Sequence, residues 1–189
     1  MMDALPLFPL QCVLFPDGRR ELRVFEKRYM DMAAGCMKDE QPFGVCLIKQ
    51  GHEVGAAANP HSVGTSAYIK QWAMPQSGIL ALAVRGRRRF RVRGIQVQKD
   101  QLILADVEWL PTELPMPVPD KQLSLVRFLR QILKETGAVR YFAAPSWDQA
   151  GWVANRLAEA LPIANRQALL EMDDPVQRLE RLAGMLEHG

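Results

Sequence analysis

The sequence predicts an α+β protein in which a β-rich part is followed by a smaller helical part. Over residues 1–110, short apolar segments alternate with turn residues around one early helical segment, which is typical of a mixed β-barrel. Beyond residue 120 the apolar residues recur with the period of a helix instead of that of a strand. Four prolines fall between residues 111 and 119, so residues 111–120 are predicted to form a semi-rigid linker.

Composition favours a conventional folded protein. The chain has 189 residues, of which 48% are hydrophobic and 24% are charged, values that exclude a disordered or collagen-like chain. Three cysteines without CxxC spacing indicate buried thiols in a reducing compartment. No apolar run is long enough to cross a membrane, and the first residues do not resemble a secretion signal. We therefore expect a cytoplasmic protein that does not insert into membranes.

The β-rich part begins with an apolar segment that is interrupted by proline. Residues 5–16 hold three prolines, which cannot donate to a strand ladder, so a broken or edge strand is predicted. A helix is predicted near residues 25–39, where apolar side chains recur at helical spacing. Further strands are predicted at 43–49, 63–72, 79–84, 88–98 and 102–109. The Gly- and Ala-rich loop 50–62 is predicted to be the most mobile region of this part.

The helical part is predicted to be a bundle of about four helices. Apolar faces are formed by Leu125, Val126, Leu129, Ile132 and Leu133, and then by Val153, Leu157 and Leu161. Ser146 and Gln149 fit a capping box that opens the second of these helices. Asp174, followed by a proline, fits the N-cap of the last helix, and a short helix is predicted over residues 165–172.

The sequence holds none of the familiar catalytic or metal-binding motifs. It lacks the P-loop Gly-Lys pair, the Gly-x-Ser-x-Gly elbow and the His-Glu-x-x-His motif. His52 and His61 lie in a polar loop and are interpreted as solvated side chains, not as metal ligands. We therefore expect a protein that is not an enzyme and that holds neither a cofactor nor a metal.

The densest polar feature is the arginine-rich segment 85–93. If it forms a strand, Phe90 and Val92 point inward and the arginines at alternate positions share the opposite face. A candidate site for RNA or another acidic polymer consists of Arg87, Arg88, Arg89, Arg91 and Arg93. The alternative is a solvated barrel face whose arginines pair with nearby carboxylates, and it is favoured because no aromatic residues interleave to stack on bases.

Three sequence blocks follow one another along almost the whole chain. The first is Leu5-Pro6-Leu7-Phe8-Pro9-Leu10 with Val13-Leu14-Phe15-Pro16, followed by Val24-Phe25-Glu26-Lys27-Arg28-Tyr29. The second is Phe43-Gly44-Val45, Val63-Gly64-Thr65-Ser66-Ala67 and Gly86-x-x-Arg89-Phe90. The third is Leu161-Pro162-Ile163, Gln167-Ala168-Leu169-Leu170-Glu171-Met172 and Arg178-Leu179-Glu180-Arg181-Leu182. In this order they resemble the N-terminal domain of the Lon protease family.

The resemblance implies a PUA-like barrel over residues 1–110, the linker at 111–120 and a helical bundle over residues 121–189. It also implies recognition without catalysis, because the chain ends where the ATPase and protease domains of Lon would begin; we expect a stand-alone member. The expected partners are unfolded or partly unfolded proteins and a complete Lon-type protease. PUA-like barrels also occur in RNA-binding proteins, so nucleic acid remains the alternative partner.

The candidate contact site for proteins is the start of the first helix. It consists of Glu26, Lys27 and Arg28, which fall within the first block of the resemblance. The alternative interpretation is that these three residues are ordinary surface charges of the helix.

Overall fold

The computed structural model describes residues 4–142 and 144–187, which fold into seven strands, five α-helices and two short 3-10 helices. The expected α+β class is confirmed, with one early helix in the β-rich part and four α-helices after it. The chain divides into two compact units, Met1–Thr112 and Glu113–Gly189. The first unit contains every strand, and the second contains the later helices.

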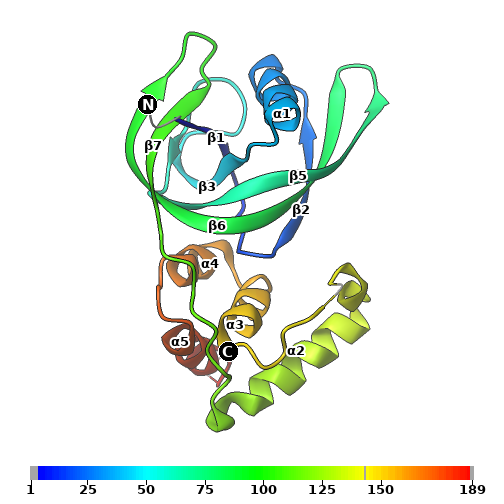
Figure 1. Ribbon diagram of the computed structural model, residues 1–189, viewed down its shortest axis with the longest axis vertical. Coiled ribbons are helices and arrows are strands. Elements are labelled where there is room, and N and C mark those ends of the chain that lie inside the picture. The colour runs from blue at the N-terminus through cyan, green and yellow to red at the C-terminus, as the bar shows by residue number, and fades with distance from the viewer. Residues whose placement is uncertain (1–3, 143, 188–189) are drawn as a thin grey trace. The chain divides into compact units, whose positions relative to one another are not determined.

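The first unit is a β-barrel with two additional strands (Figure 1). Its elements are β1 (Leu5–Leu10), β2 (Arg19–Val24), α1 (Lys27–Asp39), β3 (Phe43–Gln50), β4 (Asn59–Pro60), β5 (Val63–Gln76), β6 (Ile79–Val97) and β7 (Ile103–Trp109). The strands follow the order β1-β7-β6-β5-β3-β4, and a parallel pairing of β1 with β3 closes a ring of β1, β7, β6, β5 and β3. Outside this ring β2 pairs with β6, and β4 pairs with β3.

The main core of this unit is formed by α1 and the strands around it. The rings of Phe8 and Tyr29 stack with their centroids 4.1 Å apart, and Phe43 lies fully buried beside Phe8. The buried face of α1 continues through Met32 to Cys36, at the helical spacing that the sequence shows. Phe25 was expected on this face but is 56% exposed, because the helix begins only at Lys27.

The prediction of a broken or edge strand over residues 5–16 is confirmed in part. β1 ends at Leu10, and only Leu7 has a paired neighbour on both sides. β7 pairs with β1 over Leu5–Leu7, and β3 pairs with it over Leu7–Leu10. Pro6 and Pro9 therefore each have only one paired neighbour, which is how the strand tolerates residues without an N–H.

The two strands expected over 79–84 and 88–98 are one continuous strand, β6. The glycine at position 86 suggested a break, but the chain accommodates it with a bulge. Between the pairs Thr65–Arg89 and Ala67–Gly86, β5 advances by two residues and β6 by three. A second irregularity in the pairing with β7 lies between Val92 and Gly94. Bulges of this kind bend a strand without ending it.

The second unit is helical, as expected. Its elements are η1 (Asp120–Gln122), α2 (Leu123–Glu135), η2 (Ala138–Tyr141), α3 (Ala150–Ala158), α4 (Ile163–Leu170) and α5 (Pro175–Glu187). The N-cap of α5 is confirmed, since Asp174 Oδ1 accepts from the N–H groups of Val176 and Gln177 at 2.8 and 3.1 Å.

The predicted capping box of α3 is wrong. The helix begins at Ala150, its N-cap Gln149 makes no side-chain capping bond, and it ends at Ala158, before Leu161. The N–H of Ala150 donates instead to the carbonyl of Met116 at 2.8 Å, and Gln149 forms a β-bridge with Pro117. The N–H of Gln149, which a capping box would join to the Ser146 hydroxyl, donates to the Ser146 carbonyl at 3.0 Å.

Arg178 is the buried polar centre of the second unit. Its side chain is about 1% exposed and donates to the carboxylate of Glu113 at 2.6 Å and to the amide oxygen of Asn155 at 2.9 Å. It also donates to the carbonyls of Leu169 and Met172. One guanidinium thus joins the segment before η1 to α3, α4 and the turn before α5.

Replacing Arg178 with Met should destabilise the protein by about 3–5 kcal/mol, because a buried carboxylate and amide lose their charged partner. Chemical denaturation in urea measures the free energy of unfolding. The matched control is Arg181→Met on the same helix at an exposed position, which should change stability by less than about 0.5 kcal/mol. Equal losses in both variants would contradict the assignment.

The buried cysteines should react slowly with thiol reagents. Burial raises the pKa of Cys36 to about 11 and that of Cys46 to about 12, above the ordinary value of 9.0. The thiolate is the reactive form, so at pH 8 modification of both should be at least about 100-fold slower than in urea-unfolded protein. The rate should rise with pH up to about pH 11 for Cys36 and about pH 12 for Cys46. Rapid labelling of native Cys46 near pH 8, detected by peptide mass spectrometry, would contradict the burial.

Candidate functional site

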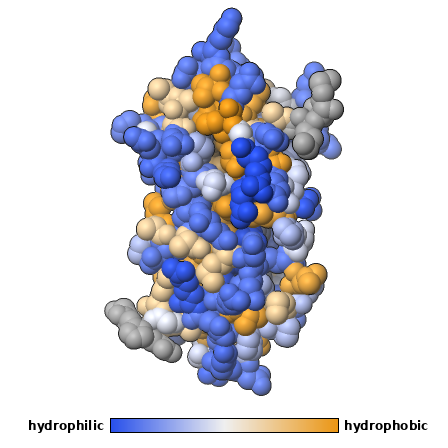
Figure 2. All heavy atoms as spheres, turned by 90° about the vertical axis from the view of Figure 1, so that its left-hand side faces the viewer, coloured by the Kyte–Doolittle hydropathy of each residue, from blue (hydrophilic) through white to orange (hydrophobic). Residues whose placement is uncertain are grey.

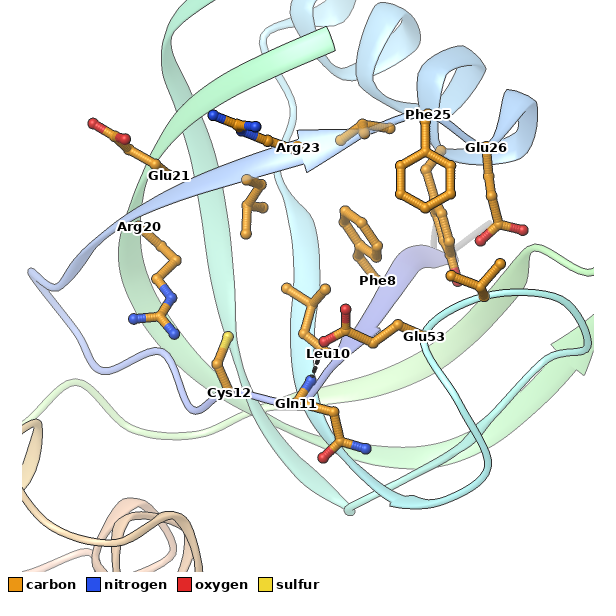
Figure 3. A pocket seen from close by; sticks show the side chains of 14 residues that line it. Phe8, Leu10, Gln11, Cys12, Arg20, Glu21, Arg23, Phe25, Glu26 and Glu53 are labelled. Atoms are coloured by element: carbon orange, nitrogen blue, oxygen red, sulfur yellow. Dashed lines mark hydrogen bonds between the residues drawn. The ribbon is translucent and has the colours of Figure 1, made fainter. Parts of the chain in front are cut away.

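A pocket of about 300 Å³ opens on the first unit (Figure 3). It is lined by the end of β1 and the residues after it, by β2, by the start of α1 and by the loop that follows β3. Three of these segments follow one another between residues 8 and 29, and the loop comes later, at residues 53 and 54, so no single element marks the pocket in the sequence. Glu26 is the one residue of the predicted protein-contact site that lines it.

One end of the pocket is apolar. Phe8 and Leu10 line it from β1, and Tyr29 lines it from α1. Burial raises the pKa of the Tyr29 hydroxyl despite the opposing effect of the Arg28 guanidinium, which lies 4.5 Å from the centre of its ring. Phe25 stands at this end and keeps more than half of its surface exposed. An incoming apolar side chain therefore has an aromatic surface to cover.

Hydrogen bonds hold the loop 51–58 against the pocket. The N–H of Gln11 donates to Glu53 Oε1 at 2.5 Å, and the N–H of Gly55 donates to Glu26 Oε2 at 3.3 Å. The N–H of Ala57 donates to the side chain of Gln101 at 3.2 Å. No local pattern indicated a role for this loop, but Glu53 and Val54 form part of the pocket wall.

The three residues at the start of α1 have different surroundings. Glu26 Oε1 accepts from Arg28 at 3.1 Å, and Arg28 is buried, where it also donates to the carbonyl of Gln101 at 2.8 Å. Lys27 is exposed and pairs with Asp31 one turn along the helix. The structure thus brings Glu26 and Arg28 together and leaves Lys27 in solvent. Their role in binding a protein stays a prediction.

β2 forms the remaining wall, and the sequence analysis did not predict this strand. Its composition, Arg-Arg-Glu-Leu-Arg-Val, contains four charged residues, and only Leu22 and Val24 are buried. The signal was their alternation with charged residues, which is typical of a half-buried strand. Figure 3 shows Arg20 pointing toward Cys12, whereas Glu21 and Arg23 point to the other side of β2.

The arginines of β6 do not form one exposed set. Arg89 is about 4% exposed and Arg93 pairs with Glu108, so the prediction that alternate arginines project together into solvent is wrong for Arg89. Phe90 is fully buried, as predicted. The physical reason is the pair of irregularities in β6. They break the simple alternation of side chains and so change which residues of the arginine-rich segment face the core.

The arginines before Arg89 also contact groups within the fold. Arg88 donates to the carbonyl of Leu110 at 2.9 Å and lies over the ring of Trp109. Arg87 lies over the ring of Tyr68, with 5.6 Å between the guanidinium carbon and the ring centre. Arg91 is half-buried in the same strand. The structure does not test whether this segment binds an acidic polymer.

Apolar side chains also reach the surface away from the pocket. Figure 2 shows hydrophobic residues among hydrophilic ones on the face where the hairpin of β6 and β7 lies. On this hairpin Ile95 is 49% exposed and Val97 is 46% exposed. These residues line no part of the pocket and provide a matched comparison for Phe25.

The residues that the structure describes, 4–142 and 144–187, hold no helix that is both long enough and apolar enough to cross a bilayer. They also contain no group of three or more His, Cys, Asp or Glu side chains arranged to hold a metal ion.

Comparisons with known proteins point in one direction. The family model described as ATP-dependent protease La (LON) substrate-binding domain matches residues 4–188. Lon protease 3 of Sorangium cellulosum is 26% identical over 207 aligned positions, which cover 97% of this chain. Lon protease 2 of Herpetosiphon aurantiacus is 27% identical over 206 positions, which cover 96% of it. The chain spans only 23% of the length of each of these curated relatives.

Solved structures agree with the family match. A Lon N-terminal domain protein from Xanthomonas campestris is 36% identical with a TM-score of 0.82, and the match covers 97% of this chain and 98% of that one. The N-terminal domain of the Mycobacterium avium complex Lon protease has a TM-score of 0.62 at 18% identity, and the match covers 95% of both chains. The second comparison shows a shared fold only.

Proposed function

The chain belongs to the family of Lon substrate-binding domains, and from this premise we propose that it binds exposed segments of unfolded or partly unfolded proteins. In this proposal it serves proteolysis by recognition and performs no chemistry of its own. The observation that carries the proposal is the pocket of the first unit, with its apolar end and the exposed ring of Phe25.

The surface chemistry of the pocket suits an unfolded segment. Unfolded chains expose apolar side chains that a folded protein hides, together with unpaired backbone groups. Phe25 offers most of the aromatic contact area, since the rings of Phe8 and Tyr29 are nearly buried, and aromatic residues contribute most of the energy at many protein interfaces. The polar rim of arginines and glutamates keeps the site hydrated when it is empty.

The functional groups of the pocket support binding without catalysis. Its lining residues include no histidine, serine or lysine, and the cysteine among them, Cys12, is buried. The carboxylates of Glu26 and Glu53 accept hydrogen bonds from backbone N–H groups, which assigns them a structural use. In our proposal the contact site for the bound segment consists of Glu26, Lys27 and Arg28. Of these three residues, Glu26 is the one that lines the pocket.

A complete Lon-type protease is the second partner that we propose. The support is that the curated relatives are Lon proteases, of which this chain matches one part. We propose that the protein works in the cytoplasm, because its three cysteines are buried and form no disulfide. The arginines of β6 already contact groups within the fold, so the proposal does not extend to nucleic acid.

Replacing Phe25 with Ala should weaken binding of an unfolded protein by roughly 5- to 30-fold, which corresponds to about 1–2 kcal/mol of lost apolar contact. Fluorescence anisotropy with labelled, reduced and carboxymethylated α-lactalbumin provides the measurement. The matched control is Ile95→Ala, which removes a similarly exposed apolar side chain from the hairpin and should change affinity less than about twofold.

Two results would count against the proposal. Absence of saturable binding at tens of micromolar protein would overturn the proposed function, on the usual affinity range of weak complexes. Equal effects of the two substitutions would leave the proposed binding in place but would show that it does not occur at the pocket.

A further inference from the structure

The pocket lies along an unpaired edge of β2. β2 pairs with β6 at all six of its residues, and within residues 4–142 and 144–187 no other strand pairs with it. The pocket is lined by the consecutive residues from Arg20 to Glu26. Side chains of a strand alternate between its faces, so a pocket over one face would be lined by every second residue. A consecutive run indicates that the pocket follows the backbone edge.

The opposite wall of the pocket is also a strand without a neighbour on that side. β5 takes one side of β6, while β7 and β2 share the other side, with β7 at Phe90–Val97 and β2 at Leu80–Arg85. β1 pairs with β7 only over Leu5–Leu7. From Phe8 onward β1 therefore faces β2 across the pocket, and the barrel wall lacks one strand pairing there.

A side chain occupies the place of a strand carbonyl at this gap. Just after β1, the N–H of Gln11 donates to the carboxylate of Glu53, which reaches it from the loop after β3 (Figure 3). Backbone N–H groups at a sheet edge normally pair with water or another strand. The contact satisfies the N–H of Gln11, and the backbone of β2 remains an edge open to a bound segment.

The unpaired edge of β2 favours an extended segment over a helix. A helix bonds its backbone N–H and C=O groups to one another and has none to offer along its length to β2. An extended chain presents alternate side chains to the pocket and places its backbone along β2.

The pocket also differs in character between its ends. Phe25 and Arg20 lie at opposite ends of it, as Figure 3 shows. Arg20 shares a strand face with Leu22 and Val24 because the three alternate along β2. In the part of the chain that the structure describes, the Arg20 guanidinium has no hydrogen bond or ion pair, so it is available to a carboxylate.

We propose that the bound segment adds to the edge of β2 as an antiparallel strand. Antiparallel pairing is the commoner arrangement and is slightly more stable per residue. Along its own direction, such a segment meets Val24 first, then Leu22 and then Arg20. An apolar side chain suits each of the first two positions, and an acidic side chain suits the third. The preferred sequence is therefore apolar-x-apolar-x-acidic. This inference rests on the proposed function and specifies how an unfolded protein is held.

The first test uses a fluorescent peptide of sequence Gly-Thr-Leu-Thr-Phe-Thr-Glu-Thr-Gly, blocked at both ends, and methylates its backbone nitrogens one at a time. Strand addition predicts losses of about tenfold or more at alternate positions and less than about threefold at the positions between them. Equal losses at all positions, or none, would overturn the pairing with β2.

The second test reverses a charge on β2. Arg20→Glu should weaken binding of this peptide by about tenfold or more, and a peptide with Lys in place of Glu should regain the affinity on that variant. The matched control is Arg19→Glu, an adjacent exposed arginine on the other strand face, with an expected change below about threefold. Equal effects of the two substitutions would overturn the register.

The unfolded α-lactalbumin assay, run on the same proteins, separates this inference from the proposed function. If unfolded α-lactalbumin binds but N-methylation of the peptide does not weaken binding at alternate positions, strand addition is overturned and the proposed function stays in place. Failure of both ligands to bind would overturn the function as well.

Discussion

The first unit depends on a single constraint, which is that β6 must pair with three other strands. Its 19 residues would extend roughly 60 Å if straight. The strand instead curves around the barrel, as Figure 1 shows, with bulges that let it bend. Gly86 marks where the pairing on one side passes from β2 to β7. Its carbonyl accepts from Asp17, its N–H donates to Gly18, and the Phe15 carbonyl approaches too closely for a side chain to fit.

The same bend explains the arginines that dominate the sequence around it. At the first bulge, Ser66 Oγ accepts from the N–H of Arg88 and donates to its carbonyl, so a side chain satisfies the backbone groups that the ladder leaves unpaired. The Arg88 side chain then bonds the backbone of Leu110 at the end of the barrel. Arg85 pairs with Asp17 in the turn before β2. A segment that suggested nucleic-acid binding therefore has a structural use at the bend.

The sequence predicted what local periodicity determines. The core face of α1 and the Asp174 cap follow from residues within two turns of one another. Pairings between distant segments were not predictable in this way. The prolines of β1 indicate a strand with incomplete pairing but not its partners, and one of these, β7, lies about 100 residues further along the chain. Glu26 was a candidate contact residue, whereas Phe8, Arg20 and Glu53 meet only after the barrel closes.

The open edge of β2 raises a question of solubility, since an unpaired strand invites pairing between copies. Natural proteins protect such edges with charged side chains and short strands. β2 has only six residues, and Arg19, Glu21 and Arg23 are exposed along it. The loop bearing Glu53 covers the facing backbone of β1, so a rigid neighbouring sheet would meet charges and a side chain there. A flexible, extended segment can still enter, because it needs only the edge of β2 and the space beside Phe8. The features that limit association between folded proteins thus leave access for an unfolded one.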